Sequence, residues 1–330
     1  MKHPATRKPG AVFLVGAGPG DPGLITIRGV ECLRRADVVL YDHLVDPALL
    51  EYAPPHAELI GPVHDAQKQG ADQGEIHPRM IAAPREGKTV VRLKAGDPDV
   101  FGRSAEEVEA LTKAGIPYVT VPGVTAALAA AAYAGIPLTH PEHSSAVALV
   151  AAQQRQSRRG AALDYGSLAS FPGTLIFYMG VASAPQWSEA LLRRGKPADT
   201  PAAIVCRCSC SDQVTIRCTL GTVAEVIAQR DLKPPAVIVV GEVVALAPEV
   251  SWFASRPLYG KRVLVTRPRA QANALSDRLH DLGAQVLFQP AIEISDPPDW
   301  EPVDRALADL DRCDWLVFSS ANGVSHLLKR

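Results

Sequence analysis

Two glycine-rich turns are the segments of this sequence whose residues are best suited to hold a small molecule. They read Gly16-Ala17-Gly18-Pro19-Gly20-Asp21-Pro22-Gly23 and Leu93-Lys94-Ala95-Gly96-Asp97-Pro98. Each follows a short apolar run typical of a β-strand, Val12 to Val15 and Val90 to Leu93. Open α/β sheets bind ligands beyond the carboxyl ends of their strands, and glycine lets the backbone come close to a ligand. The two turns therefore predict a cradle for a small molecule.

The first turn is similar to a dinucleotide-binding fingerprint but departs from it at one position. The pattern G-x-G-x-x-G requires glycine where this chain has Asp21. The sequence also has no Walker A motif, the loop that cradles the phosphates of nucleoside triphosphates. These two observations disfavour NAD and a phosphate cradle.

Three cysteines alternate with other residues in Cys206-Arg207-Cys208-Ser209-Cys210. A β-strand at this position would place all three thiols on one face, where they could form a soft-metal site. The other interpretation is that they are small, buried side chains. Neither a CxxC pair nor a nearby histidine completes a zinc ligand set. We therefore predict no metal site.

The composition restricts the kinds of partner that the chain can bind. Its 330 residues include 34 Lys and Arg against 35 Asp and Glu, a formal net charge of -1, which provides no broad surface for nucleic acid. An anionic ligand must therefore meet a local group of arginines. No apolar stretch is long enough to cross a membrane, and the polar start of the chain is unlike a secretion signal. We expect a cytoplasmic protein whose partners include neither a membrane nor nucleic acid.

The two turns belong to a chain that alternates strand-like and helix-like segments. Further strands are expected at Val38 to Tyr41, Tyr118 to Val121, Ala146 to Ala151, Thr174 to Tyr178, Ala202 to Cys206, Val214 to Arg217 and Ala236 to Val240. Thr26 can cap a helix after the first turn. Capping boxes of the S/T-x-x-E type predict two more helices, and their residues are Ser104 with Glu107 and Thr222 with Glu225. The fold class is α/β.

A segment with two prolines separates this alternation from a second α/β unit. Residues 248–260 include Trp252 and Phe253, which we expect to be exposed in an interdomain linker. The new unit is expected to contain strands and a helix at Arg262 to Thr266, Ala270 to Leu282, Gln285 to Phe288 and Trp315 to Phe318. Its length of about seventy residues is too small for a complete doubly wound domain. Residues 261–330 are therefore expected to be an incomplete α/β segment.

Seven motifs between residues 11 and 247 resemble, in one order, those of the uroporphyrinogen-III C-methyltransferases of the tetrapyrrole methylase family. They lie at residues 15–22, 36–42, 90–103, 121–126, 134–140, 177–180 and 239–244. Typical examples are Ala36-Asp37-Val38-Val39-Leu40-Tyr41-Asp42 and Ala134-Gly135-Ile136-Pro137-Leu138-Thr139-His140. Residues 261–330 resemble the opening part of uroporphyrinogen-III synthase through Val265-Thr266-Arg267-Pro268 and Phe318-Ser319-Ser320-Ala321-Asn322-Gly323.

The resemblance implies a two-domain tetrapyrrole methylase fold, with domains at residues 11–122 and 123–247, a linker at 248–260 and the synthase-like segment at 261–330. It implies a homodimer that binds S-adenosylmethionine, releases S-adenosylhomocysteine and methylates uroporphyrinogen III at two pyrrole carbons. The product would be precorrin-2, which leads to sirohaem and cobalamin. The cofactor contacts carried over by motif are Pro19, Ala95, Gly96, Asp97, Val100, Thr125, Ala126, Met179, Cys208 and Ala236.

The resemblance also assigns roles to charged residues. Asp42 stands at the family's proposed proton-acceptor position, and the alternative is that it caps the following turn. Because the substrate carries several carboxylates, basic residues in or near the motifs are candidate substrate contacts. Each of them could instead form a structural salt bridge. These candidates are Arg28, Arg92, Lys94 and Arg103.

Three positions depart from the usual family motifs. The family's Gly-Lys-Arg, whose lysine is a proposed proton donor, is replaced by Gly61-Pro62-Val63-His64. His64 is our candidate for the missing lysine, with Lys68 or no replacement as alternatives. Ala95 stands where glycine is usual, which is tolerable if its φ angle stays negative. Cys206-Arg207-Cys208-Ser209 replaces Glu-Asn-Gly-Thr, so the Cys208 side chain could weaken cofactor binding.

Two alternative functions follow from these departures and from the breadth of the family. One is methylation of another substrate by the same fold, namely a later corrinoid, ribosomal RNA or a modified histidine. The RNA branch typically has Ala-Gly-Thr-Pro where this chain has Ala95-Gly96-Asp97-Pro98. The other is a catalytically impaired protein that binds a tetrapyrrole or S-adenosylhomocysteine. We expect no synthase activity from residues 261–330.

Overall fold

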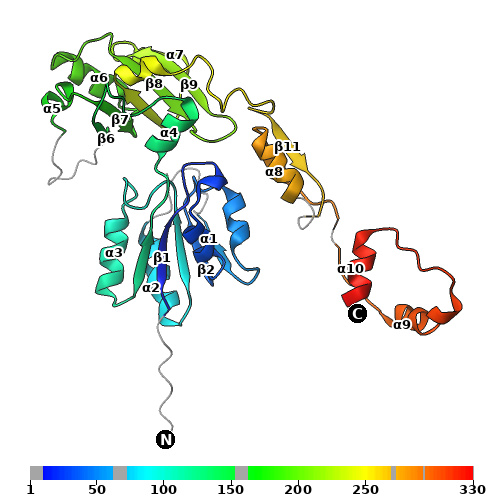
Figure 1. The fold of residues 1–330 in the computed structure, drawn as a ribbon. Helices are drawn as coiled ribbons and strands as arrows, with labels where there is room; N and C mark the ends of the chain where they lie inside the picture. The colour runs from blue at the N-terminus through cyan, green and yellow to red at the C-terminus, as the bar shows by residue number, and fades with distance from the viewer. Residues whose placement is uncertain (1–9, 62–72, 153–162, 269–272, 293, 330) are drawn as a thin grey trace, which may run out of the picture. The chain divides into compact units, whose positions relative to one another are not determined.

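The computed structural model describes residues 10–61, 73–152, 163–268, 273–292 and 294–329. His64 and Lys68 lie outside these ranges. The chain divides into two compact units, Met1–Tyr259 and Gly260–Arg330 (Figure 1). Both glycine-rich turns, at residues 16–23 and 93–98, belong to the first unit.

The first sheet has five parallel strands in the order β3-β2-β4-β1-β5. They are β1 (Val12–Gly16), β2 (Val38–Tyr41), β3 (Glu58–Ile60), β4 (Val90–Lys94) and β5 (Tyr118–Val121). β1 lies between β4 and β5, so the three strands end side by side at one edge. The prediction that both glycine-rich turns leave the carboxyl edge of one sheet is confirmed.

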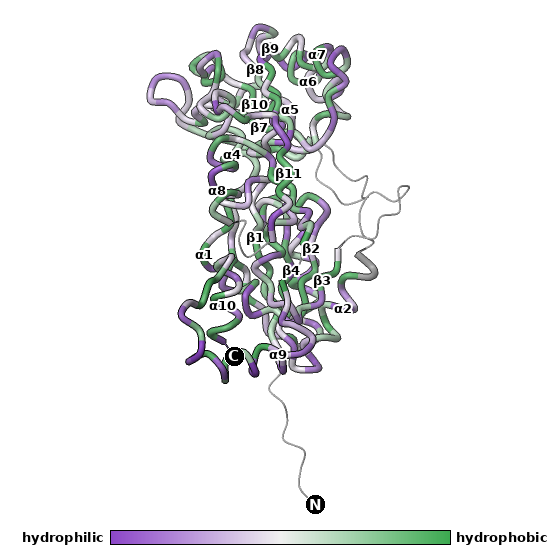
Figure 2. Tube along the Cα trace, turned by 90° about the vertical axis from the view of Figure 1, so that its right-hand side faces the viewer, coloured by the Kyte–Doolittle hydropathy of each residue, from purple (hydrophilic) through white to green (hydrophobic). Residues whose placement is uncertain are grey.

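Helices cover both faces of this sheet, and they are α1 (Ile27–Leu33), α2 (Gln73–Arg85) and α3 (Ser104–Lys113). On one face Val15 packs in a cluster with Leu33 of α1. On the other face Leu14 packs in a cluster with Met80 of α2 and Leu111 of α3. Alternate residues of a strand therefore point into opposite cores, which makes the strand hydrophobic throughout. β1 accordingly has the hydrophobic colour in Figure 2.

The second sheet has five strands in the order β6-β7-β10-β8-β9. They are β6 (Val147–Ala151), β7 (Thr174–Tyr178), β8 (Pro201–Cys206), β9 (Val214–Thr219) and β10 (Ala236–Val240). β6 is parallel to β7, whereas β10 is antiparallel to β7 and β8, and β8 is antiparallel to β9. β7 and β8 therefore end at the edge where β10 begins, with Ala236 opposite Cys206 and Val237 opposite Tyr178.

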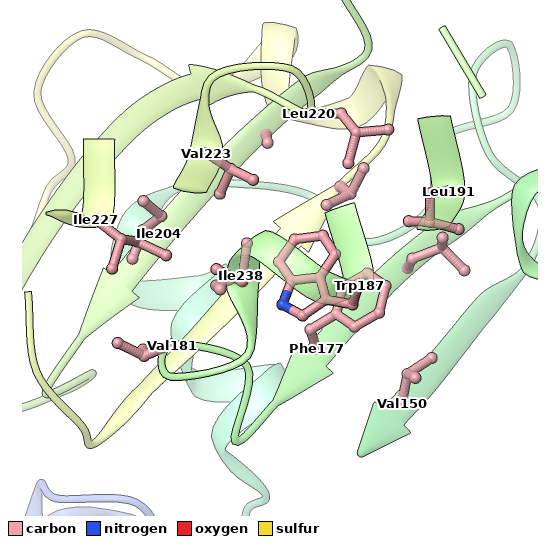
Figure 3. Packing of buried hydrophobic residues seen from close by; sticks show 14 of the residues in the cluster. Val150, Phe177, Val181, Trp187, Leu191, Ile204, Leu220, Val223, Ile227 and Ile238 are labelled. Atoms are coloured by element: carbon pink, nitrogen blue, oxygen red, sulfur yellow. The ribbon is translucent and has the colours of Figure 1, made fainter. Parts of the chain in front are cut away.

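Four helices accompany the second sheet, namely α4 (Ala126–Ala134), α5 (Tyr165–Ala169), α6 (Ala184–Arg193) and α7 (Val223–Gln229). On one face Phe177 stacks on Trp187 of α6, with ring centroids 4.2 Å apart (Figure 3). The Trp187 indole also donates a hydrogen bond to the carbonyl of Gly180, at 2.9 Å. On the other face small residues of α4, such as Ala130, pack near Val205. The central strands β7, β10 and β8 are therefore buried on both faces, whereas the outer strands β6 and β9 are partly exposed.

The helix starts were predicted better than the caps. The Thr26 hydroxyl accepts a hydrogen bond from Gly29 N at 3.0 Å and caps α1, as predicted. α3 and α7 begin close to the predicted positions, but neither capping box forms. Arg103 precedes α3 with a φ of 57°, and the Glu107 carboxylate lies in the interior. The prediction that Glu107 caps α3 was wrong because buried cations attract its carboxylate more strongly.

Residues 248–260 are less exposed than predicted. Trp252 is 55% exposed, but Phe253 is only 1% exposed. The Phe253 ring packs against Tyr133 of α4, with ring centroids 4.6 Å apart. The expectation that both aromatic residues are exposed was therefore wrong for Phe253. Tyr259 ends the first unit, and the boundaries of the predicted domains stay predictions.

The second unit contains the parallel strands β11 (Arg262–Val265) and β12 (Gln285–Phe288) with the helices α8 (Asn273–Asp281), α9 (Glu301–Ala308) and α10 (Ala321–Lys329). The strand predicted at Trp315 to Phe318 does not form, and Trp315 and Val317 are largely exposed. No other strand in the described ranges pairs with this segment, and an isolated strand leaves its backbone groups unsatisfied. In the same ranges we find no helix with the length and apolar character needed to cross a membrane.

Trp187→Ala should lower the free energy of unfolding by about 3 to 5 kcal/mol, because the variant empties a fully buried site beside Phe177. Urea denaturation of the full chain measures this loss. Trp187→Phe is the matched control, since it keeps a ring next to Phe177 and removes only the donor to Gly180. The control should lose clearly less stability. Equal losses in the two variants would contradict the packing explanation.

Candidate functional site

Three glycines pack backbone against backbone where β1, β4 and β5 end. A side-chain carbon on Gly16 would lie 2.6 Å from Gly123 N and 2.7 Å from Gly96 O, closer than real carbon atoms approach. Gly18 and Gly96 also exchange two backbone hydrogen bonds, at 3.2 and 2.7 Å. The two glycine-rich turns thus form one continuous surface of backbone groups. Pro19 follows directly in the first of these turns.

The second turn is held by Asp97. Its Oδ2 accepts a hydrogen bond from Gly123 N at 3.0 Å, and its Oδ1 accepts one from Asp99 N at 2.8 Å. Gly96 has a φ of 69°, which glycine adopts without strain. Ala95 is not among the described non-glycine residues with positive φ, so the condition for tolerating an alanine there is met. Direct cofactor contacts of Ala95, Gly96 and Asp97 stay predictions.

Tyr178, at the end of β7, connects the second sheet to this surface. Its hydroxyl lies 2.7 Å from Thr125 Oγ1 and accepts a hydrogen bond from Ala127 N at 2.8 Å. Its ring packs against Phe101, with centroids 4.9 Å apart. The next residue, Met179, is 47% exposed and has a φ of 53°, which is uncommon outside glycine. Strained backbone of this kind is common at ligand sites. The contact between Tyr178 and Thr125 brings Thr125 and Met179 to one candidate site.

The segment after β8 is a turn. Arg207 and Ser209 have φ angles of 49° and 63°, so the chain cannot continue as a strand. Cys206 packs in the core on one face of the second sheet and Cys208 in the core on the other face. The alignment of thiols on one face, considered from the sequence, therefore does not occur. Cys208 Sγ lies 3.8 Å from Ala126 O, which places both predicted cofactor residues beside each other.

The environment of these cysteines favours the buried-side-chain interpretation. Burial raises the pKa of Cys208 to about 12 and that of Cys210 to about 11. Both thiols are therefore protonated near pH 7.

A second group of ligand-type side chains lies elsewhere in the described part of the chain. Ligand atoms of His140, Glu142 and His143 come within 4.8 Å of one another. However, His140 Nδ1 already accepts a hydrogen bond from Glu142 N at 3.2 Å, and none of the three residues is fully buried. We assign no metal to this group.

Arg92 and Lys94 are buried at the end of β4, where the alternation of the strand directs both towards α3. Glu107 of α3 accepts hydrogen bonds from Arg92 Nε at 3.0 Å and from Lys94 Nζ at 2.8 Å. Arg92 Nη2 donates to Asp42 Oδ1, and Ala95 N donates to Asp42 Oδ2 at 3.3 Å. Two acids and two bases thus form one network that holds Asp42 at the end of β2.

This network decides between two interpretations of the basic residues. The side chains of Arg92 and Lys94 are 5% and 4% exposed. Burial acts to lower the pKa of Arg92, but the charges of Asp42 and Glu107 outweigh it and the pKa is raised. The structure therefore favours internal salt bridges over substrate contacts for Arg92 and Lys94. In the described part of the chain, the Asp42 carboxylate accepts hydrogen bonds from Arg92 and Ala95 N, and the following turn is closed by a backbone bond from Val45 N to the carbonyl of Asp42.

The remaining candidate residues are less constrained. Arg28 forms an exposed pair with Glu31 at 3.0 Å, and Arg103 forms one with Glu106. Their substrate contacts stay predictions. Val100 lies in the turn between β4 and α3, and its cofactor contact also stays a prediction. His64 cannot be assigned a position, because it lies outside the described residues.

Two residues of the site were missed from the sequence. Tyr178 is part of a quoted motif, but its hydroxyl was given no role. Glu107 was interpreted as a helix cap. A signal for it exists, because Arg92 and Lys94 alternate with apolar residues on a strand that must be buried on both faces. Buried charges require a counter-charge, and Glu107 is the acid that supplies it.

Glu107→Gln should lower the free energy of unfolding by about 3 to 5 kcal/mol. The variant removes the carboxylate shared by the buried Arg92 and Lys94, and Asp42, paired with Arg92, is then the one acid left in the network. Chemical denaturation measures the change. Glu106→Gln, at the neighbouring exposed position paired with Arg103, is the matched control. It should cost at most about 1 kcal/mol. Similar losses at the two positions would show that the buried network is not a stabilising feature.

Two family models and several known proteins match parts of this chain. Residues 11–224 match the family Tetrapyrrole (Corrin/Porphyrin) Methylases, and residues 273–330 match Uroporphyrinogen-III synthase HemD. A Uroporphyrinogen-III C-methyltransferase of Priestia megaterium is 45% identical over 235 residues, which are 71% of this chain and 98% of that protein. The Porphyrin biosynthesis protein HemD of Ruminiclostridium josui is 39% identical over 315 residues, 96% of this chain and 62% of that protein.

The chain thus spans less than two thirds of the Ruminiclostridium relative. Among solved structures, a uroporphyrin-III C-methyl transferase from Thermus thermophilus complexed with S-adenosyl homocysteine has a TM-score of 0.60 and 39% sequence identity. The match covers 72% of this chain and 100% of that one. On the strength of the matched residues 11–224, this chain belongs to the tetrapyrrole (corrin/porphyrin) methylase family.

Proposed function

We propose that this protein transfers methyl groups from S-adenosylmethionine to two pyrrole carbons of uroporphyrinogen III and so forms precorrin-2. One observation carries this proposal. At one edge of the first sheet, the two glycine-rich turns offer a surface of backbone groups, and the carboxylate of Asp42 is fixed beside them by Arg92. The Priestia relative, matched over 98% of its length, carries the name of this activity. The same reaction is therefore our proposal for this chain.

S-adenosylmethionine suits the residues at this edge. Gly96, Ala95 and Ala126 present backbone groups with little side-chain bulk, and Met179 offers an exposed, polarizable side chain. The Thermus relative was solved with the demethylated product, S-adenosyl homocysteine. S-adenosylmethionine supplies a methyl group on a positive sulfur, so the task of the protein is mainly to align donor and acceptor.

Asp42 is the proposed proton acceptor. Methylation of a ring carbon requires a proton to leave the macrocycle, and an ionised carboxylate within reach can take it. The Asp42 side chain is 30% exposed, while Arg92 and Ala95 N fix its two oxygens. This combination leaves the group accessible but oriented. His64 is retained as the proposed partner that donates a proton.

We further propose a cytoplasmic homodimer whose product enters sirohaem or cobalamin synthesis. Large apolar side chains on α1 and α4 support the dimer, because Ile27 is 82% exposed and Leu128 is 56% exposed. Exposed apolar side chains of this size commonly mark a subunit interface. Arg28 and Arg103 are the proposed contacts for the carboxylates of the substrate, because both are accessible.

Incubation of the full chain with uroporphyrinogen III and S-adenosylmethionine should yield a product that carries two added methyl groups, measured by mass spectrometry. S-adenosylhomocysteine should bind in calorimetry, and NAD should not. Binding of S-adenosylhomocysteine without any methylated product would support the alternative of a catalytically impaired binding protein. Methylation of a later corrinoid or of RNA in preference to uroporphyrinogen III would assign the protein to another branch of the family.

Asp42→Asn should lower kcat by about 100-fold to 10,000-fold, the usual effect of losing a general base. The affinity for S-adenosylhomocysteine should change little, because Asp42 acts on the macrocycle. Asp37→Asn is the matched control, since Asp37 precedes β2 and its carboxylate accepts a hydrogen bond from Thr89 N at 2.7 Å. The control should retain turnover. Near-normal turnover in Asp42→Asn would leave Asp42 only its structural pairing with Arg92.

A further inference from the structure

Residues 251–259 follow the second sheet and reach the first glycine-rich turn through two separate sets of contacts. We propose that this segment positions the cofactor turn by holding Asp21 from two sides, through Tyr133 on one side and through Gln213 and Ser209 on the other. The inference rests on the proposed function, because it assigns residues 16–23 to S-adenosylmethionine binding. It extends the methylase unit beyond residue 247, where the predicted second domain ends.

The first set of contacts runs through α4. The Tyr133 hydroxyl donates a hydrogen bond to Asp21 Oδ2 at 2.6 Å. The Tyr133 ring packs against Phe253 at 4.6 Å and against Trp252 at 5.2 Å between centroids. The Trp252 indole donates to the carbonyl of Ala132 at 2.9 Å, which fixes the segment on α4. The buried Phe253 ring therefore holds the phenol that binds Asp21.

The second set of contacts runs through the turn after β8. The Tyr259 hydroxyl donates to the backbone carbonyl of Gln213. The Gln213 side-chain oxygen accepts a hydrogen bond from Ser209 N at 2.8 Å, and the Ser209 hydroxyl accepts one from Asp21 N at 2.9 Å. Ser209 has a φ of 63°, a strained conformation that persists only when neighbouring groups hold it. Asp21 is thus held through its carboxylate by one set and through its backbone by the other.

The two sets meet within the segment itself. The rings of Phe253 and Tyr259 lie 5.6 Å apart in an edge arrangement, and the Arg256 guanidinium lies 4.0 Å from the Phe253 ring centroid. The two sets of contacts are therefore joined at both ends, at Asp21 and within residues 251–259. Asp21 Oδ1 in turn accepts a hydrogen bond from Gly23 N at 2.8 Å, so the shape of the turn depends on Asp21.

The turn has little space in which to move. A side-chain carbon on Gly20 would lie 2.9 Å from Cys208 O and 3.0 Å from Ser209 Oγ. Burial and the Asp21 hydrogen bond raise the pKa of Tyr133, so its hydroxyl is a donor near pH 7. If this donor is lost, the turn must be ordered by the cofactor at a cost to its affinity.

The test is S-adenosylhomocysteine binding to the full chain by calorimetry, together with KM for S-adenosylmethionine and kcat. Tyr133→Phe removes only the hydroxyl that binds Asp21, and Phe253→Leu removes the ring behind it. Each should weaken binding by about fivefold or more, the range typical of coupling between sites. KM should rise while kcat stays near the unaltered value, because Asp42 is held by a different network. Tyr165→Phe is the matched control, since Tyr165 packs on the opposite face of the second sheet.

The double variant distinguishes positioning from general destabilisation. If both residues act through Asp21, the loss of affinity in Tyr133→Phe with Phe253→Leu should be smaller than the sum of the single losses. If Phe253→Leu does not fold, Tyr259→Phe replaces it and tests the second set of contacts, in which Tyr259 donates to Gln213. Unchanged S-adenosylhomocysteine affinity in Tyr133→Phe, with normal binding by the unaltered chain, would overturn this inference alone. Failure of the unaltered chain to bind S-adenosylhomocysteine would overturn the proposed function as well.

Discussion

The Glu107 carboxylate pairs with both cations that β4 carries into the interior, and the candidate site depends on this pairing. A lone buried cation costs several kcal/mol, and a network of this kind is stable only when every member is paired. Here Arg92 is shared between Glu107 and Asp42. The pairing explains why a residue in a ligand-binding motif need not touch a ligand. Arg92 acts on the site by fixing Asp42.

The glycines have an equally specific physical role. Gly16, Gly96 and Gly123 come so close that a side chain on Gly16 or Gly123 would collide with backbone. The parallel sheet brings the ends of β1, β4 and β5 to one edge, and the glycines let the chain segments beyond those ends join. The second sheet contributes Tyr178 to the same surface. Its mixed topology is what aligns the ends of β7 and β8 with the start of β10.

The departures from the family motifs look less severe in the folded chain. Ala95 is not in a positive-φ conformation, so its methyl group adds no backbone strain. Cys208 directs its thiol towards Ala126 O within the core cluster that includes α4. A buried thiol of raised pKa occupies that space as a small apolar group. Both observations reduce the expected obstacle to cofactor binding at these two positions.

Local patterns in the sequence determined the strands, the turns and the family. Short apolar runs such as Thr174 to Tyr178 predicted the strand bounds correctly, because burial on both faces leaves little freedom in residue type. Thr26 predicted its cap correctly, since that interaction spans only three residues. The family motifs could also be recognised in the sequence, because turns with glycine and proline are specified by a few neighbouring residues.

Only the tertiary structure decided which distant groups meet. Glu107 has the spacing of a helix cap, but the cations of β4 take its carboxylate. Phe253 has the surroundings of a linker residue, but Tyr133 buries it. Trp315 to Phe318 has the pattern of a strand and finds no partner strand among the described residues. In each case the outcome depends on a partner far away in the sequence, and no local pattern records whether that partner comes within reach.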